Sequence, residues 1–183
     1  MKNEINQEYL RECFEYIDGI LYWKERPRNH FSNDGTWKTW NLKFAGKIAG
    51  CNSYYNEGKA CYWKISIDDK RYRRSRLVYI FHNGSITDNL IIDHISGESL
   101  DDRFENLRAI TQYENCYNSK LYSNNCSGVT GVSFCNRFKK WFSYGQINKK
   151  RKQLYRGDDF FEAVCARRAY ENSNNLITDR HGK

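Results

Sequence analysis

The stretch Asp93–Ser119, DHISGESLDDRFENLRAITQYENCYNS, decides how this chain is interpreted. An Asp-His pair, Asp93 and His94, ends a short apolar run, and such a run predicts a β-strand. Asn106 follows His94 by 12 residues in a polar loop, and Asn115 follows it by 21 residues in a stretch that predicts a helix. The sequence therefore predicts a strand, a loop and a helix that each deliver polar side chains.

These residue types suit the hydrolysis of a phosphodiester, which requires a base to deprotonate water and a hard cation to neutralise the phosphate. His94 is the candidate base, because an imidazole exchanges protons near neutral pH. Asp93 and the amide oxygen of Asn115 are hard oxygen ligands of the kind that Mg²⁺ prefers. Asn106 is expected to fix the loop and orient the imidazole. Asn118, three residues after Asn115 on the same helix face, is a second candidate ligand.

The segment Lys59–Lys120 resembles the HNH endonucleases, in particular the phage and intron-encoded branch in which the third motif position is Asn instead of His. The resemblance also rests on RYRRSRLVYIFHNG before the active strand and ENLRAIT after the loop. It implies a ββα-metal core around one divalent ion, Mg²⁺ or Mn²⁺, with no small-molecule cofactor. His94 corresponds to the general base, Asp93 and Asn115 to the metal ligands, and Asn106 to the central structural Asn.

The flanking sequence predicts an α+β protein. Leu10, Cys13, Phe14 and Ile17 recur at helical spacing, which predicts a helix that ends at Asp18-Gly19. Two alternating runs on either side of Asp68-Asp69 predict a β-hairpin, and a helix is expected to end at Asn83-Gly84. We expect three parts: a small β-rich region over 1–58, the nuclease core over 59–120, and a third domain over 121–183.

The third part is expected to contain three strands and a helix, with the strands at 129–135, 140–147 and 151–156 and the helix at 160–172. Gly131-Val132, Trp141, Gly157 and the Glu162-Ala163 to Ala169-Tyr170 segment resemble the ethylene-response-factor type of DNA-binding domain. That resemblance implies a three-stranded sheet in the major groove with a helix behind it. The helical spacing predicts an inward face of Phe161, Val164, Cys165, Ala169 and Tyr170.

Charge supports duplex DNA as the partner. The chain carries 30 Lys and Arg residues against 22 Asp and Glu residues, and nine basic residues with no acidic one lie between Ser119 and Arg156. Such a run suits phosphate contacts. The residues expected to contact DNA are Arg76, Arg108, Arg137, Lys139, Lys149, Lys150, Arg151, Lys152 and Arg156. Trp141 either stacks on a sugar or packs on the helix, with packing favoured.

Composition limits the other classes. No stretch approaches the roughly 20 apolar residues of a membrane span, and the start shows no apolar signal region. Seven cysteines without a C-x-x-C pair argue against structural zinc and for reduced thiols. Together with the phage resemblance, we expect the cytoplasm of an infected bacterial host. The loop around Asp101 and Asp102 is expected to stay outside the phosphate path.

The leading hypothesis is a homing-type HNH DNA endonuclease that nicks duplex DNA. The alternative is a DNA-binding regulator that does not cleave and uses the C-terminal domain, and an RNase or nuclease toxin fits less well. Residues 1–58 either extend the DNA footprint or form only a small β core, and both readings stay open. Whether the protein is a monomer or a dimer is also left open.

Overall fold

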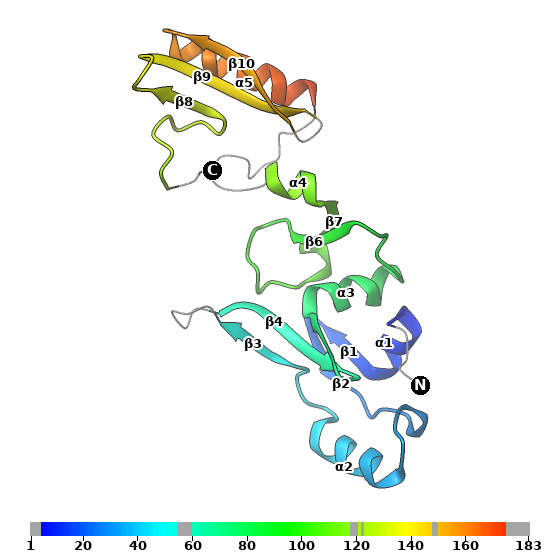
Figure 1. Cartoon of the computed structure of the whole chain (residues 1–183). Coiled ribbons are helices and arrows are strands. Elements are labelled where there is room, and N and C mark those ends of the chain that lie inside the picture. The colour runs from blue at the N-terminus through cyan, green and yellow to red at the C-terminus, as the bar shows by residue number, and fades with distance from the viewer. Residues whose placement is uncertain (1–4, 55–59, 118–120, 122, 148–149, 175–183) are drawn as a thin grey trace. The chain divides into compact units, whose positions relative to one another are not determined.

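A computed structural model describes residues 5–54, 60–117, 121, 123–147 and 150–174. The chain forms two compact units, Met1–Thr111 and Gln112–Lys183 (Figure 1). The first unit combines helices with several small sheets and the second combines helices with one sheet, so the predicted α+β class is confirmed. The division at residues 58 and 120 stays a prediction. No helix in the described ranges is long and apolar enough to cross a membrane.

The first unit begins with α1 (Gln7–Cys13), which Asn6 caps, followed by a hairpin of β1 (Phe14–Ile17) and β2 (Ile20–Trp23). The helix predicted up to Ile17 was therefore wrong over its last four residues. Asp18 and Gly19 have φ angles of 45° and 83°, and two consecutive left-handed residues form the turn that a two-residue hairpin needs. This Asp-Gly turn overrides the helical spacing. A short 3₁₀ turn, η1 (Arg28–His30), and α2 (Asp34–Phe44) follow.

The next sheet has the order β3-β4-β5 and leads directly into a helix. Its strands are β3 (Cys51–Tyr54), β4 (Ala60–Ile67) and β5 (Lys70–Arg73). The predicted hairpin turn at Asp68-Asp69 is confirmed, with left-handed φ angles of 49° and 64°. The helix α3 (Arg74–Asn83) ends at Gly84, whose φ of 87° suits glycine, and this end was also predicted.

The segment after α3 carries the candidate site. The strands β6 (Leu90–His94) and β7 (Leu107–Thr111) pair antiparallel, and a loop ending in the 3₁₀ turn η2 (Phe104–Asn106) joins them. The core of the first unit combines side chains from before and after residue 58, namely Leu10, Phe14, Leu21, Ile65, Leu77 and Leu107. The N-terminal region is thus packed into the same core as the candidate nuclease elements.

The second unit contains α4 (Gln112–Tyr117), a sheet of order β10-β9-β8, and α5 (Phe160–Ser173). Its strands are β8 (Val132–Cys135), β9 (Lys140–Ile147) and β10 (Lys150–Gly157), as predicted within a few residues. The predicted inward face of α5 was partly wrong, because Phe161 is 72% exposed and Cys165 and Ala169 are also exposed.

The residues that α5 buries are Ala163, Arg167, Tyr170 and Glu171. Arg167 and Glu171 form an ion pair of 2.7 Å, and the Arg167 guanidinium also donates to the carbonyl of Tyr144. Two charged residues lie on the sheet side because they neutralise each other there. A prediction from hydrophobic spacing alone could not place them inward.

Candidate active site

Strand β6 places Asp93 and His94 at its C-terminal end. Successive residues of a strand point to opposite faces, so the carboxylate and the imidazole are directed apart. Asp93 lies opposite Arg108 in the β6–β7 register, and His94 lies opposite Leu107. Both side chains are largely buried, with 13% of Asp93 and 14% of His94 exposed. The pairing with β7 therefore fixes the two residues on a rigid element.

His94 is held by a buried carboxylate, Asp102, to which the sequence pattern gives no role at the candidate site. The Nε2 atom of His94 lies 2.7 Å from Oδ1 of Asp102, which is 3% exposed. Because an ionised carboxylate only accepts hydrogen bonds, this contact favours the tautomer in which Nε2 donates to Asp102 and Nδ1 carries the lone pair. Asp102 thus fixes the ring orientation and the tautomer that a general base requires.

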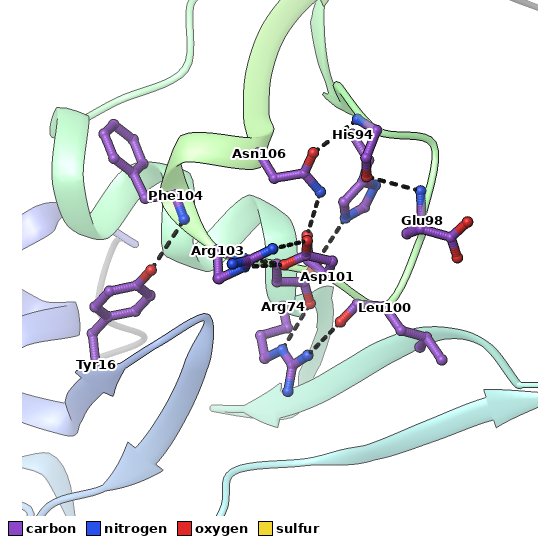
Figure 2. A network of polar contacts seen from close by, with 11 residues as sticks. Tyr16, Arg74, His94, Glu98, Leu100, Asp101, Arg103, Phe104 and Asn106 are labelled. Atoms are coloured by element: carbon purple, nitrogen blue, oxygen red, sulfur yellow. Dashed lines mark hydrogen bonds and ion pairs between the residues drawn. The ribbon is translucent and has the colours of Figure 1, made fainter.

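Arg74 completes this chain of contacts from the start of α3. Its Nε atom donates to Oδ2 of Asp102 at 2.7 Å, and its Nη2 atom donates to the carbonyl of Leu100 at 3.1 Å (Figure 2). The guanidinium also lies 4.9 Å from the ring centre of Trp63. Both oxygens of Asp102 are therefore engaged, one by His94 and the other by Arg74.

A pattern in the sequence could have revealed this pair. Arg74 lies three residues before Leu77 and four before Val78, so it falls on the apolar face of α3. A buried arginine needs a carboxylate partner, and the acidic loop supplies it. The expectation for Asp101 and Asp102 treated them alike, whereas the structure separates them. Asp102 points inward to His94, and Asp101 pairs with Arg103 at 2.7 Å, a contact that lowers the pKa of Asp101.

Asn106 connects the two sides of the loop between β6 and β7. Its Oδ1 atom accepts from the backbone N–H of Ser96 at 2.8 Å, and its Nδ2 atom donates to the carbonyl of Asp101 at 2.8 Å (Figure 2). The backbone carbonyl of Asn106 accepts from Ile95. These contacts hold the loop that carries Asp102, while a role of Asn106 in catalysis stays a prediction.

The β1–β2 hairpin supports the same loop from the N-terminal region. The hydroxyl of Tyr16 accepts from the backbone N–H of Phe104 at 3.0 Å. A Cβ atom on Gly19 would lie 2.7 Å from the backbone nitrogen of Arg103, so the hairpin turn and the loop are in close contact. Trp23 and Arg26 are buried, and Arg26 pairs with Asp68. Part of residues 1–58, the β1–β2 hairpin, thus packs against the loop that carries Asp102.

The candidate metal ligands have the chemistry of a hard-cation site. Asp93 offers carboxylate oxygens and Asn115 an amide oxygen, which suits Mg²⁺ or Mn²⁺. In this structure Arg108 donates to Oδ2 of Asp93 through Nε at 3.0 Å and Nη2 at 2.9 Å. Asn115 lies on α4 in the second unit, and Asn118 lies outside the described residues. Among the described residues, no three His, Cys, Asp or Glu side chains gather into a metal cluster.

The sheet of the second unit carries several residues predicted to contact DNA on the face opposite α5. Arg156 lies opposite Phe142 in the register, and its guanidinium is 5.5 Å from that ring and 4.8 Å from the ring of Phe138. The Arg151 guanidinium is 3.5 Å from the ring of Tyr144. Two planar guanidinium groups therefore lie on aromatic rings of one sheet face, where they remain exposed.

The other predicted contacts surround this face. Arg137 and Lys139 lie in the turn between β8 and β9, Lys150 and Lys152 are exposed on β10, and Lys149 lies outside the described residues. Trp141 lies on the opposite side of the sheet, 4.6 Å from the ring of Phe160. Of the two predictions for Trp141, packing on the helix therefore agrees with its contacts. In the first unit, Arg76 is exposed on the first turn of α3.

Comparison with known proteins agrees with the location of this site. The HNH endonuclease family model matches residues 72–117. Protein 3.8 of Escherichia phage T7 is 35% identical over 94 residues, which cover 51% of this chain and 76% of that protein. No solved structure matches the chain at a significant level. The matched range contains Arg74, His94 and Asp102, together with Asn106 and Asn115.

Proposed function

The chain belongs to the HNH endonuclease family, and we propose that it is a divalent-metal-dependent endonuclease that hydrolyses phosphodiester bonds in duplex DNA. The observation that carries the proposal is the His94–Asp102–Arg74 chain at the end of β6, inside the range that matches the family. A histidine oriented by a buried carboxylate is suited to take a proton from water.

In the proposed reaction, His94 accepts the proton of a water molecule that attacks the phosphorus in line with the departing 3′ oxygen. Asp102 keeps the ring in one orientation and stabilises the imidazolium that forms. By the family resemblance, the products carry 5′-phosphate and 3′-hydroxyl ends. Asn106 contributes by holding the loop that positions Asp102.

Asp93 and Asn115 would hold the divalent ion, Mg²⁺ or Mn²⁺. When bound, such an ion neutralises charge on the phosphate and on the leaving oxygen. Arg108 pairs with Asp93 in the present structure. When Asp93 binds the ion instead, Arg108 would be released to contact a DNA phosphate. The described residues contain one such site, so we propose that a single binding event nicks one strand.

We propose that the second unit supplies duplex binding in the manner of an ethylene-response-factor type domain. The exposed guanidinium groups of Arg151 and Arg156 support this, because their planar donors suit phosphates and guanine edges. The likeness to a protein of Escherichia phage T7 supports action of a homing-type phage enzyme within an infected bacterial cell.

The alternative is a regulator that binds DNA through the second unit and does not cleave it. Incubation of supercoiled plasmid with the protein in Mg²⁺, in Mn²⁺ and with a chelator separates the two functions. The nuclease produces relaxed circles that disappear with the chelator. Metal-independent binding without any product, on plasmids that carry candidate target sites as well, would favour the regulator.

A further inference from the structure

One face of the β4–β5 hairpin in the first unit carries an unusual concentration of positive charge. Ile65 and Ile67 of β4 are buried in the core, so the alternate residues of the hairpin face away from it. This outer face consists of Tyr62, Lys64, Ser66, Arg71 and Arg73. Arg71 and Arg73 are exposed, and Tyr62 and Lys64 are half-buried.

The register places like charges directly opposite each other. Lys64 lies opposite Arg73, and Arg71 follows on the same strand opposite Ser66. Like charges at opposed positions of an antiparallel pair repel and cost stability. In the described part of the chain, no carboxylate lies within ion-pair distance of these three cations. Five other arginines of this unit have carboxylate partners: Arg26, Arg28, Arg74, Arg103 and Arg108.

An aromatic ring orients one of these cations without neutralising it. The Arg73 guanidinium lies 4.7 Å from the ring centre of Tyr62 on the neighbouring strand. This contact holds the planar group on the sheet while its N–H donors keep their full charge. The hairpin therefore maintains a like-charge surface that folding alone would not favour, which indicates an anionic partner.

The sequence around Arg73 links this surface to the candidate active site. Arg74, the next residue, turns inward to Asp102 and thereby to His94, and Arg76 is exposed again. A polyanion on the outer face would thus bind the same short segment that supports the candidate base.

We propose that the outer face, defined by Tyr62, Lys64, Ser66, Arg71 and Arg73, binds the phosphate backbone of duplex DNA as a second contact surface, separate from the sheet of the second unit. This inference rests on the proposed function, since the HNH family indicates DNA as the substrate. Its cations on two adjacent strands offer donors that suit the phosphates of a duplex.

The test compares the full-length protein with the triple variant Lys64→Gln, Arg71→Gln, Arg73→Gln. Binding to a fluorescent duplex is measured in chelator, from about 50 to 200 mM salt, so that cleavage does not interfere. Loss of three phosphate contacts makes the slope of log K against log salt shallower by roughly 2.7, and affinity at the middle of that range falls at least about tenfold. The melting temperature should be equal or higher, because the repulsion between Lys64 and Arg73 is removed.

The matched control is Lys70→Gln, which removes an exposed cation of the same hairpin that lies opposite the buried Ile67 and therefore not on the outer face. A slope change in the control as large as a third of that in the triple variant, an unchanged slope in the triple variant, or equally strong binding to polyglutamate would each overturn the proposal. Plasmid cleavage by the parent protein is measured separately. If the parent cleaves and the triple variant keeps the parent's salt slope, only the proposed contact surface is refuted. If the triple variant has a reduced slope and the parent does not cleave, only the proposed nuclease activity is refuted.

Discussion

The Nε2 atom of His94 lies 2.7 Å from Oδ1 of Asp102, a buried carboxylate whose other oxygen accepts from Arg74. This contact gives the β6–β7 loop a role in positioning His94, whereas the sequence alone indicates only that the loop is polar. It also explains why Arg74 lies on the buried face of α3, where a cation without a carboxylate would be destabilising. The candidate base is therefore positioned by residues from two elements, α3 and the β6–β7 loop.

Replacing Asp102 tests whether the carboxylate positions the base. We expect Asp102→Asn to reduce the plasmid cleavage rate about 10- to 100-fold with little change in KM, because the amide no longer fixes the tautomer of His94. The matched control is Asp101→Asn, which changes the neighbouring, more exposed carboxylate and should cleave at nearly the parent rate. Similar plasmid cleavage rates for both variants would show that Asp102 does not position His94. Melting curves verify that both variants are folded at the assay temperature.

Asn106 is expected to hold the loop through its two side-chain contacts. Asn106→Ala removes the acceptor for Ser96 and the donor to Asp101, so stability should fall by about 1–3 kcal/mol in urea unfolding. The amide of Ser96 should also exchange with solvent faster than in the parent protein. Unchanged exchange at Ser96 would show that other contacts hold the loop.

His82 predicts a dependence of stability on pH. Its ring stacks on Phe104 at 4.3 Å, and burial lowers its pKa below the ordinary value of 6.5. The unfolded chain therefore binds a proton at His82 more readily than the folded chain does. The stabilisation that the neutral, buried ring gives the folded state is complete above about pH 6.5 and is lost as the pH falls below it.

The check is urea unfolding at a neutral and a mildly acidic pH for the parent protein and for His82→Phe. We expect a smaller loss of stability on acidification in the variant, because phenylalanine keeps the ring contact with Phe104 and cannot bind a proton. An equal loss in both proteins would assign the pH dependence to other groups.

The sheet of the second unit predicts different effects for two cations on adjacent strands. Arg156 lies exposed against Phe142, whereas Lys140 pairs with Asp158 at 3.1 Å. Arg156→Gln should weaken duplex binding by about 1–3 kcal/mol if it contacts a guanine, or reduce the salt slope by about 0.9 if it contacts a phosphate. Lys140→Gln should have a smaller effect, and the reverse order would exclude this face as the binding surface.

Much of the architecture follows from local sequence signals. The Asp68-Asp69 turn, the helix end at Gly84 and the three strands of the second unit were predicted because turn residues and alternation fix them locally. The strand at Phe14–Ile17 differs from the predicted helix because the Asp-Gly turn that follows it favours a hairpin over the helical spacing of its apolar residues.

The site was predictable in its residue types and less so in its contacts. The spacing of Asp93, His94 and Asn106 placed them on β6 and its loop, as the structure shows. The hydrogen bond between His94 and Asp102 depends on a tertiary contact, because the β6–β7 loop has to fold back onto α3. In α5, the spacing of apolar residues likewise could not predict that the ion pair of Arg167 and Glu171 is buried.

The most direct test is the cleavage rate of supercoiled plasmid in Mg²⁺ by the parent protein and by His94→Ala, with duplex affinity measured in chelator for both. The account predicts that His94→Ala binds duplex DNA like the parent and cleaves it about 10²- to 10⁴-fold more slowly, because the positioned base is missing. Cleavage by His94→Ala at nearly the parent rate, with the same metal requirement, would contradict the assignment of His94 as the base.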